Sequence, residues 1–205
     1  MNSSTPVPAA RIAVPVAAQE SWLRPAGTVL SGSAFIAACA HVALPLYFTP
    51  VPLTLQPFAV LTLGLLLSPR LAAAALVAYL GEGAVGLPVF APGIAGTLGL
   101  AHLLGPTGGY LLSYPFAATL ISSLWRSSRR GLFSAMLSAA AGNALILCTG
   151  AVWLGIFTHA SLQLVITQAI LPFVPGDALK VVAAGALATG WQRLRDRKFS
   201  SFPTK

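Results

Sequence analysis

Charged residues are scarce in this sequence: they make up 8% of the 205 residues, and only four of them are acidic. A soluble domain carries about a quarter charged residues, so these few cannot cover the surface of a water-soluble globule. Hydrophobic residues make up 56% of the chain, and the mean hydropathy is +0.81. The apolar runs are long enough to cross a hydrocarbon core about 30 Å thick. The composition therefore predicts an all-α polytopic membrane protein with one helical bundle.

Cysteine is scarce as well, and motifs for metal or nucleotide chemistry are missing. Cys39 and Cys148 fall in apolar runs without a CxxC or Cys/His spacing, so neither a disulfide nor a structural metal is predicted. No glycine-rich segment ends in Gly-Lys-Ser/Thr, so the chain is not expected to use ATP by itself. His41, His102 and His159 lie in separate segments without an H-E-x-x-H pattern. We therefore expect no metal, no cofactor and no catalytic residue.

The net charge of +8 does not indicate a nucleic-acid partner, because the basic residues are scattered between apolar runs and form no stripe. They separate six apolar segments, each of which is expected to cross the bilayer. The second segment has about fifteen residues, and a helix rises only about 1.5 Å per residue, so the bundle is expected to be irregular near one face. The expected spans are approximately 28–48, 53–67, 71–87, 110–125, 132–157 and 177–191.

The basic residues also predict the orientation of the bundle. The segments 49–52, 88–109 and 158–175 contain no lysine or arginine, which places them outside by the positive-inside rule. An even number of spans then leaves both termini in the cytoplasm. The chain divides into an N-terminal tail (1–26, expected to be mobile), a six-helix membrane domain (27–192) and a basic C-terminal tail (193–205). The residues assigned to the inside are Arg11, Arg24, Arg70, Arg126, Arg129, Arg130, Arg193, Arg195, Arg197, Lys198 and Lys205.

One basic residue, Lys180, remains on the outer half, three residues after Asp177. Residues spaced i, i+3 share one helix face, and an ionisable residue at membrane depth usually faces the bundle interior or an aqueous cavity. We therefore interpret the pair as part of a ligand site. Two plainer roles stay open. Asp177 follows Pro-Gly and could cap the helix by accepting from the backbone N–H of Lys180, and Lys180 could extend to the membrane interface.

Three uncharged polar residues are further candidates for the site. Asn143 lies in the fifth expected span among small residues that let a helix or a ligand approach closely. Gln56 starts the second span and Tyr79 lies within the third, and each of the three is also consistent with packing between helices. On the first span, Ala34 and Ala38 have the small-xxx-small spacing that lets another span or another protein pack at short distance.

The segment 88–109 is rich in glycine and proline and is unusually long for a connection. Loops of this length are usually functional, so we interpret it as a lid over the site, with a passive connector as the alternative.

Four runs of residues, in order along the chain, resemble the signature of the BioY family. The similarity covers roughly residues 28–192 and leaves both tails out. The sequence departs from the family pattern at Pro57, where a small polar residue is common, and at Glu82, which lies in a stretch that is usually apolar. The runs are Val51-Pro52-Leu53-Thr54-Leu55-Gln56-Pro57-Phe58-Ala59-Val60, Gly86-Leu87-Pro88-Val89-Phe90, Gly105-Pro106-Thr107-Gly108-Gly109-Tyr110 and Pro172-Phe173-Val174-Pro175-Gly176-Asp177-Ala178-Leu179-Lys180.

The resemblance implies a six-helix fold of the S-component type found in energy-coupling factor (ECF) vitamin transporters, in a bacterial inner membrane. It implies an outward-facing biotin site with Asp177, Lys180 and Asn143 as ligand residues, and extends less directly to Tyr79 and Gln56. It also implies partners: a transmembrane coupling protein, with Ala34 and Ala38 as its candidate contact, and two cytoplasmic ATP-binding subunits. The alternatives are an S component for another small vitamin or precursor, and an intramembrane hydrolase that uses the histidines with Glu82.

Overall fold

The computed structural model describes residues 16–92 and 98–200. Parts of both expected tails (1–15 and 201–205) and residues 93–97 of the glycine-rich segment lie outside the described residues. The all-α prediction is confirmed. The longer helices are α1 (Val16–His41), α2 (Gln56–Leu66), α3 (Pro69–Ala84), α5 (Gly108–Ser127), α6 (Leu132–Thr158) and α8 (Val174–Ser200). The shorter elements are β1 (Ala43–Leu44), β2 (Leu53–Thr54), α4 (Leu100–Leu103), α7 (Leu162–Val165) and the π-helix η1 (Ile166–Ile170).

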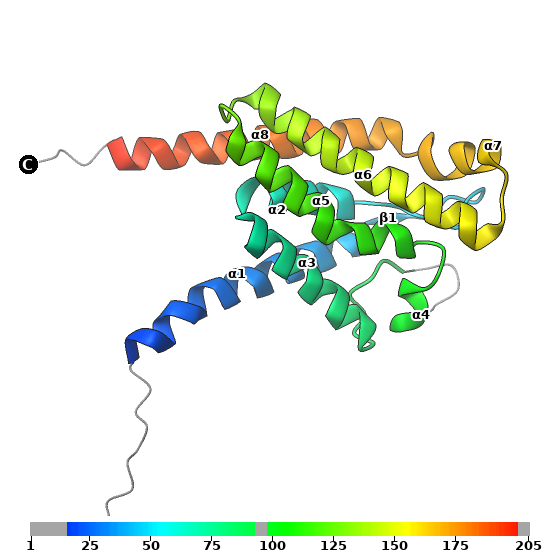
Figure 1. Ribbon diagram of the computed structural model, residues 1–205, viewed down its shortest axis with the longest axis horizontal. Coiled ribbons are helices and arrows are strands. Elements are labelled where there is room, and N and C mark those ends of the chain that lie inside the picture. The colour runs from blue at the N-terminus through cyan, green and yellow to red at the C-terminus, as the bar shows by residue number, and fades with distance from the viewer. Residues whose placement is uncertain (1–15, 93–97, 201–205) are drawn as a thin grey trace, which may run out of the picture.

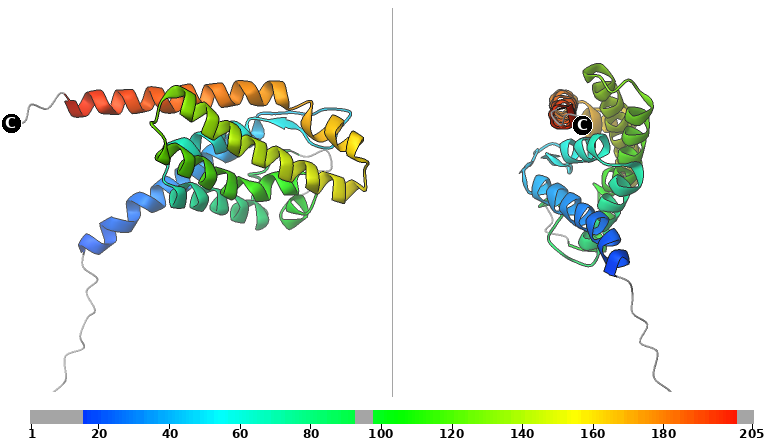
Figure 2. Two further views of the ribbon diagram at one scale, coloured as in Figure 1. Left: turned by 45° about the horizontal axis from the view of Figure 1, so that its top comes forward. Right: turned by 90° about the vertical axis from the view of Figure 1, so that its left-hand side faces the viewer.

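The long helices form one bundle in which α5 is central (Figure 1). Helix α5 packs against α2, α3 and α6, while α1 packs on α3, and α8 packs on α2 and α6. The second set of views shows α1 and α8 extending from the same end of the bundle (Figure 2). The connections α2–α3 and α5–α6 also lie at this end, whereas the β1–β2 hairpin, α4 and α7 lie at the opposite end.

Local sequence explains where several helices begin and end. Pro69 stands at the start of α3, a position where its missing N–H would have had no partner in the helix. Ser161 caps α7 by accepting from the backbone N–H of Leu164 at 3.4 Å. His159 ends α6 in the left-handed conformation, with φ of 53°. Pro115 lies inside α5, as is tolerated in membrane helices whose neighbours satisfy the freed carbonyl.

Two expected boundaries are corrected by the structure. Helix α1 begins at Val16, within the segment expected to be a tail, and ends at His41 rather than near residue 48. The residues that follow turn back on themselves, because β1 pairs with β2 in an antiparallel hairpin. Helix α8 likewise continues to Ser200, through most of the expected basic tail.

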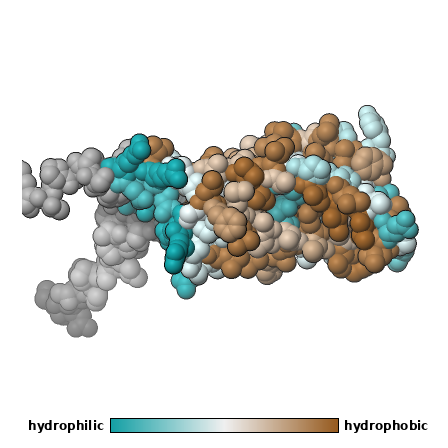
Figure 3. Space-filling model, turned by 90° about the horizontal axis from the view of Figure 1, so that it is seen from above, coloured by the Kyte–Doolittle hydropathy of each residue, from teal (hydrophilic) through white to brown (hydrophobic). Residues whose placement is uncertain are grey.

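On the face seen in Figure 3, hydrophobic residues form a broad band across the middle of the molecule, and hydrophilic residues gather towards its two ends. Large hydrophobic side chains are exposed on several helices, among them Phe116, Leu137, Ile156 and Leu179. A soluble monomer rarely exposes an apolar surface of this extent, so the band fits the hydrocarbon layer. By length and composition, α6 is the one described helix that qualifies as a membrane span. A second span is counted if the bent pair of helices 162–170 and 174–197 crosses the membrane as one unit. The count of six therefore stays a prediction.

The orientation of the bundle can be tested with two introduced cysteines. Ser161 and Ser127 are both exposed but lie at opposite ends of the bundle. In a background of Cys39→Ala and Cys148→Ala, we expect Ser161→Cys to react with a membrane-impermeant maleimide on intact cells. Ser127→Cys, beside the basic loop, should react only after permeabilisation. Labelling of Ser127→Cys on intact cells would reject the predicted orientation.

Candidate ligand-binding site

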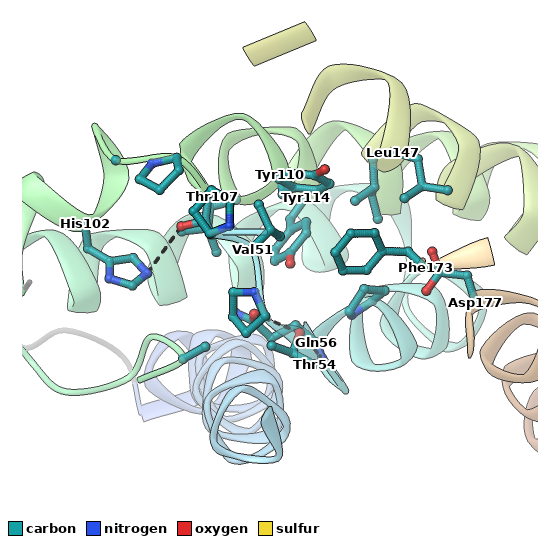
Figure 4. A pocket seen from close by; sticks show the side chains of 18 of the residues that line it. Val51, Thr54, Gln56, His102, Thr107, Tyr110, Tyr114, Leu147, Phe173 and Asp177 are labelled. Carbon is teal, nitrogen blue, oxygen red and sulfur yellow. Dashed lines mark hydrogen bonds between the residues drawn. The ribbon is translucent and has the colours of Figure 1, made fainter. Parts of the chain in front are cut away.

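A cavity of about 310 Å³ opens between the helices at the end of the bundle that carries the hairpin and α4. This volume lies at the lower end of the range for small-molecule sites, about 300–1,000 Å³. The hairpin and the start of α2 form one side, α4 and the residues before α5 form another, and α5, α6 and the start of α8 close it. Figure 4 shows the labelled side chains that converge on this space.

Asp177 and Lys180 line the cavity where α8 begins. The Lys180 Nζ donates to Asp177 Oδ1 at 2.8 Å, and the side chains are only 12% and 5% exposed. Asp177 lies in the first turn of α8, where the helix dipole favours a negative charge. The capping role left open for Asp177 does not match these contacts, because its carboxylate accepts from the ammonium of Lys180 and the amide of Asn143.

Asn143 lies directly behind this ion pair and holds the second oxygen of the carboxylate. Its Nδ2 donates to Asp177 Oδ2 at 3.0 Å, which joins α6 to α8. Asn143 is itself 7% exposed and is not among the described side chains that line the cavity. Its Oδ1 is buried with no hydrogen-bond donor among the described residues. An unsatisfied buried acceptor is costly, so this oxygen is matched to a donor that the described chain does not supply.

Gln56 and Tyr79 form a second buried polar group on the other side of the cavity. Gln56 lines the space, and its Nε2 donates to the Tyr79 hydroxyl at 2.6 Å. The hydroxyl of Thr54 donates to Gln56 Oε1 at 3.1 Å. Tyr79 is fully buried and lies behind Gln56, outside the described lining. Tyr79 therefore positions the amide of Gln56, as Asn143 positions the carboxylate of Asp177.

Three aromatic side chains contribute to the wall between these polar groups. Tyr110 and Tyr114 stand one turn apart on α5, and Phe173 lies across from Tyr110 with ring centroids 6.3 Å apart. The hydroxyl of Tyr110 donates to the carbonyl of Ala169 at 2.8 Å, which fixes this ring. These aromatic residues are not among the site residues predicted from the sequence. The i, i+4 spacing of the two tyrosines after the glycine pair was the available signal.

Two glycines set the position of the segment that precedes α5. A Cβ atom on Gly109 would lie 2.2 Å from Cβ of Trp153, and one on Gly108 would lie 2.0 Å from the carbonyl oxygen of Leu103. Only glycine permits such close approach. Trp153 then donates from Nε1 to the carbonyl of Gly105 at 2.8 Å. The shape of the run 105–110 therefore has a packing cause, because these contacts hold the segment before α5 against α4 and α6.

Ala34, Ala38 and Glu82 lie outside the described lining of the cavity. Ala34 and Ala38 are exposed on the outer face of α1. Glu82 accepts a hydrogen bond from the hydroxyl of Ser33 at 2.5 Å, which joins α3 to α1. Of the three histidines, His102 lines the cavity, and no group of three or more potential metal ligands occurs among the described residues.

Comparisons with known proteins agree on one family. The model of the BioY family matches residues 9–197. A protein of Pyrococcus horikoshii named "Probable biotin transporter BioY" is 41% identical over 68% of this chain and 79% of its own length. "Biotin transporter BioY2" of Lactococcus lactis is 35% identical over 74% and 80%. "Biotin transporter BioY" of Thermotoga maritima is 34% identical over 79% and 92%.

A solved structure has the same fold. It is the crystal structure of the S-component for biotin from an ECF-type ABC transporter, and it superposes with a TM-score of 0.76 at 25% identity. The match covers 85% of this chain and 93% of the other. The expected S-component architecture is therefore confirmed at the level of the fold.

The structure predicts that losing one charge of the ion pair is worse than losing both. Lys180→Met leaves the buried carboxylate of Asp177 without its counter-charge, which should lower the free energy of unfolding by about 3 kcal/mol. Combining Lys180→Met with Asp177→Asn removes both charges and should restore most of that loss. Thermal unfolding in detergent measures both effects, and a double variant no more stable than Lys180→Met would contradict the prediction.

Proposed function

The chain belongs to the BioY family, and on this basis we propose that it is the biotin-binding membrane subunit of a biotin uptake transporter. Its relatives are named as biotin transporters, and its fold is that of an S-component for biotin. The observation that carries the proposal is the polar corner of the cavity, where Asp177 and Lys180 face the space and the Oδ1 atom of Asn143 has no donor among the described residues.

The chemistry of biotin suits this corner. Its ureido ring presents two N–H donors and one carbonyl acceptor. The carboxylate of Asp177 accepts from one N–H, and a charge-assisted bond of this kind is stronger than a neutral one. Asn143 holds the second oxygen of this carboxylate from behind, and the ammonium of Lys180 has three donors, of which Asp177 takes one. The aromatic side chains of Tyr114 and Phe173 offer an apolar wall for the thiophane ring.

Equilibrium binding of radiolabelled biotin to the purified chain tests this assignment. Asp177→Asn and Lys180→Ala should each weaken binding by about tenfold or more, as expected when a hydrogen bond to a charged group is lost. Asp196→Asn is the matched control, because Asp196 is exposed near the far end of α8. Unchanged affinity in both site variants would remove the assignment. Displacement of biotin by another vitamin at lower concentration would favour the alternative ligand.

The chain has no ATP-binding motif of its own, so ATP-driven uptake would use partner subunits. We propose that a transmembrane coupling protein and two ATP-binding subunits drive the cycle, in a cell membrane with both termini of this chain in the cytoplasm. Ala34 and Ala38 form the proposed contact with the coupling protein. They are exposed while their neighbours Ser33 and Ile36 face the bundle, so they offer a smooth strip to a partner helix.

Replacing the small residues of this strip should separate coupling from binding. Ala34→Leu with Ala38→Leu should reduce co-purification with the coupling protein while leaving biotin affinity unchanged, because both residues lie outside the cavity lining. Ala140→Leu, an equally exposed alanine on α6, is the control and should leave co-purification intact. Undiminished co-purification of the α1 variant would show that the contact lies elsewhere.

A further inference from the structure

The cavity has two polar ends of different character. Figure 4 shows Asp177 at one end and His102 with Thr107 at the other, with Val51, Tyr114 and Phe173 between them. Biotin is likewise a molecule with two polar ends, a ureido ring and a carboxylate joined through an apolar ring and an alkyl chain. The direction in which such a ligand lies depends on which end of the cavity suits which polar group.

The Asp177 end is poorly suited to a carboxylate. The single positive charge of Lys180 is already paired with Asp177 at 2.8 Å. The other oxygen available there, Asn143 Oδ1, is an acceptor and has no donor among the described residues. A second carboxylate at this end would face acceptors and a like charge, which is unfavourable in a site of low dielectric. This end therefore suits a ligand group with N–H donors better than a second carboxylate.

The opposite end carries a hydroxyl and an imidazole, and the hydroxyl of Thr107 and a protonated ring nitrogen of His102 can each donate. His102 is 7% exposed and lines the cavity, and its Nε2 lies 3.5 Å from Oγ1 of Thr107. This separation is at the outer limit for a hydrogen bond, so a carboxylate oxygen can replace the contact and accept from both groups. Thr107 is the residue before α5, yet its side chain makes no capping bond to that helix. Its hydroxyl is directed to His102 instead.

The ring of His102 is held in place by its neighbours. It stacks on Phe90 with centroids 5.0 Å apart and planes inclined at 23°. Phe90 in turn meets Tyr79 edge to face at 5.4 Å, so the imidazole is tied to the same side chain that positions Gln56. The nearby N-terminal end of α5 adds a weak positive potential at this point. A preorganised donor of this kind is favourable for binding an anion.

We propose that His102 and Thr107 form a second subsite that binds the carboxylate of the ligand and so fixes its direction in the cavity. The proposal rests on the proposed function. In this arrangement the ureido ring lies at Asp177, and the carboxylate accepts from the imidazole N–H of His102 and the hydroxyl of Thr107. His102 and Thr107 then make the site prefer an acid over its neutral analogue.

Comparing biotin with biotinamide, in which a neutral amide replaces the carboxylate, tests the subsite. The wild-type chain should bind biotin at least about tenfold more tightly, as expected for a charge-assisted bond. His102→Phe keeps an aromatic ring to stack on Phe90, and Thr107→Val keeps the shape of threonine. In each variant the preference for biotin over biotinamide should fall towards one. Asp177→Asn should weaken both ligands by a similar factor and keep the preference, while His41→Gln, at an exposed histidine of α1, should change neither affinity.

Three outcomes overturn the proposal. A wild-type chain that binds both ligands equally has no carboxylate subsite. Equal weakening of both ligands by His102→Phe and Thr107→Val assigns these side chains a packing role alone. If Asp177→Asn loses the preference for biotin over biotinamide while His102→Phe and Thr107→Val keep it, the carboxylate binds at the Asp177 end of the cavity. Failure of the wild-type chain to bind either ligand would instead refute the proposed function itself.

Discussion

The ion pair between Asp177 and Lys180 constrains how α6 and α8 meet at the cavity, because two charges withdrawn from water must remain paired and hydrogen-bonded. Asn143 meets part of this demand by donating to Asp177, which requires α6 to lie close to the start of α8. Gly185 of α8 contributes to that close approach, since a Cβ there would lie 3.0 Å from Cγ of Met136 on α6. A hydrophobic pair would pack as well at lower cost, so the charges are best explained by a polar ligand.

Pairs of lining and supporting side chains occur on both sides of the cavity. One polar side chain lines the space and another, fully behind it, holds it in place: Asn143 behind Asp177, and Tyr79 behind Gln56. Side chains fixed in this way lose little further entropy when a ligand binds. Substitution of Asn143 or Tyr79 therefore affects binding by changing the geometry of Asp177 or Gln56.

The sequence predicted the all-α class, the residues of the polar corner and the grouping of the basic residues, because charge is so rare that its placement carries most of the information. It did not predict the β1–β2 hairpin, whose strands have two residues each and no distinguishing pattern. The sequence also did not predict that Asn143 and Tyr79 lie behind the residues that line the cavity. Spacing along one helix shows which face a residue occupies, but the contact of Asn143 with Asp177 joins residues 34 positions apart.

The shortness of α2 explains why the cavity exists at this end. Eleven residues rise about 17 Å, well short of a hydrocarbon layer of about 30 Å. The remaining depth is filled by the hairpin, whose backbone groups must be satisfied without water. Pairing of β1 with β2 does so in part, and Leu55 adds a bond to the carbonyl of Val42 at 3.1 Å. Because a hairpin is thinner than a helix with its side chains, space remains between the hairpin and α5. Val51, Thr54 and Gln56 face that space, so the hairpin and the start of α2 form one wall of the binding site where a longer α2 would otherwise lie.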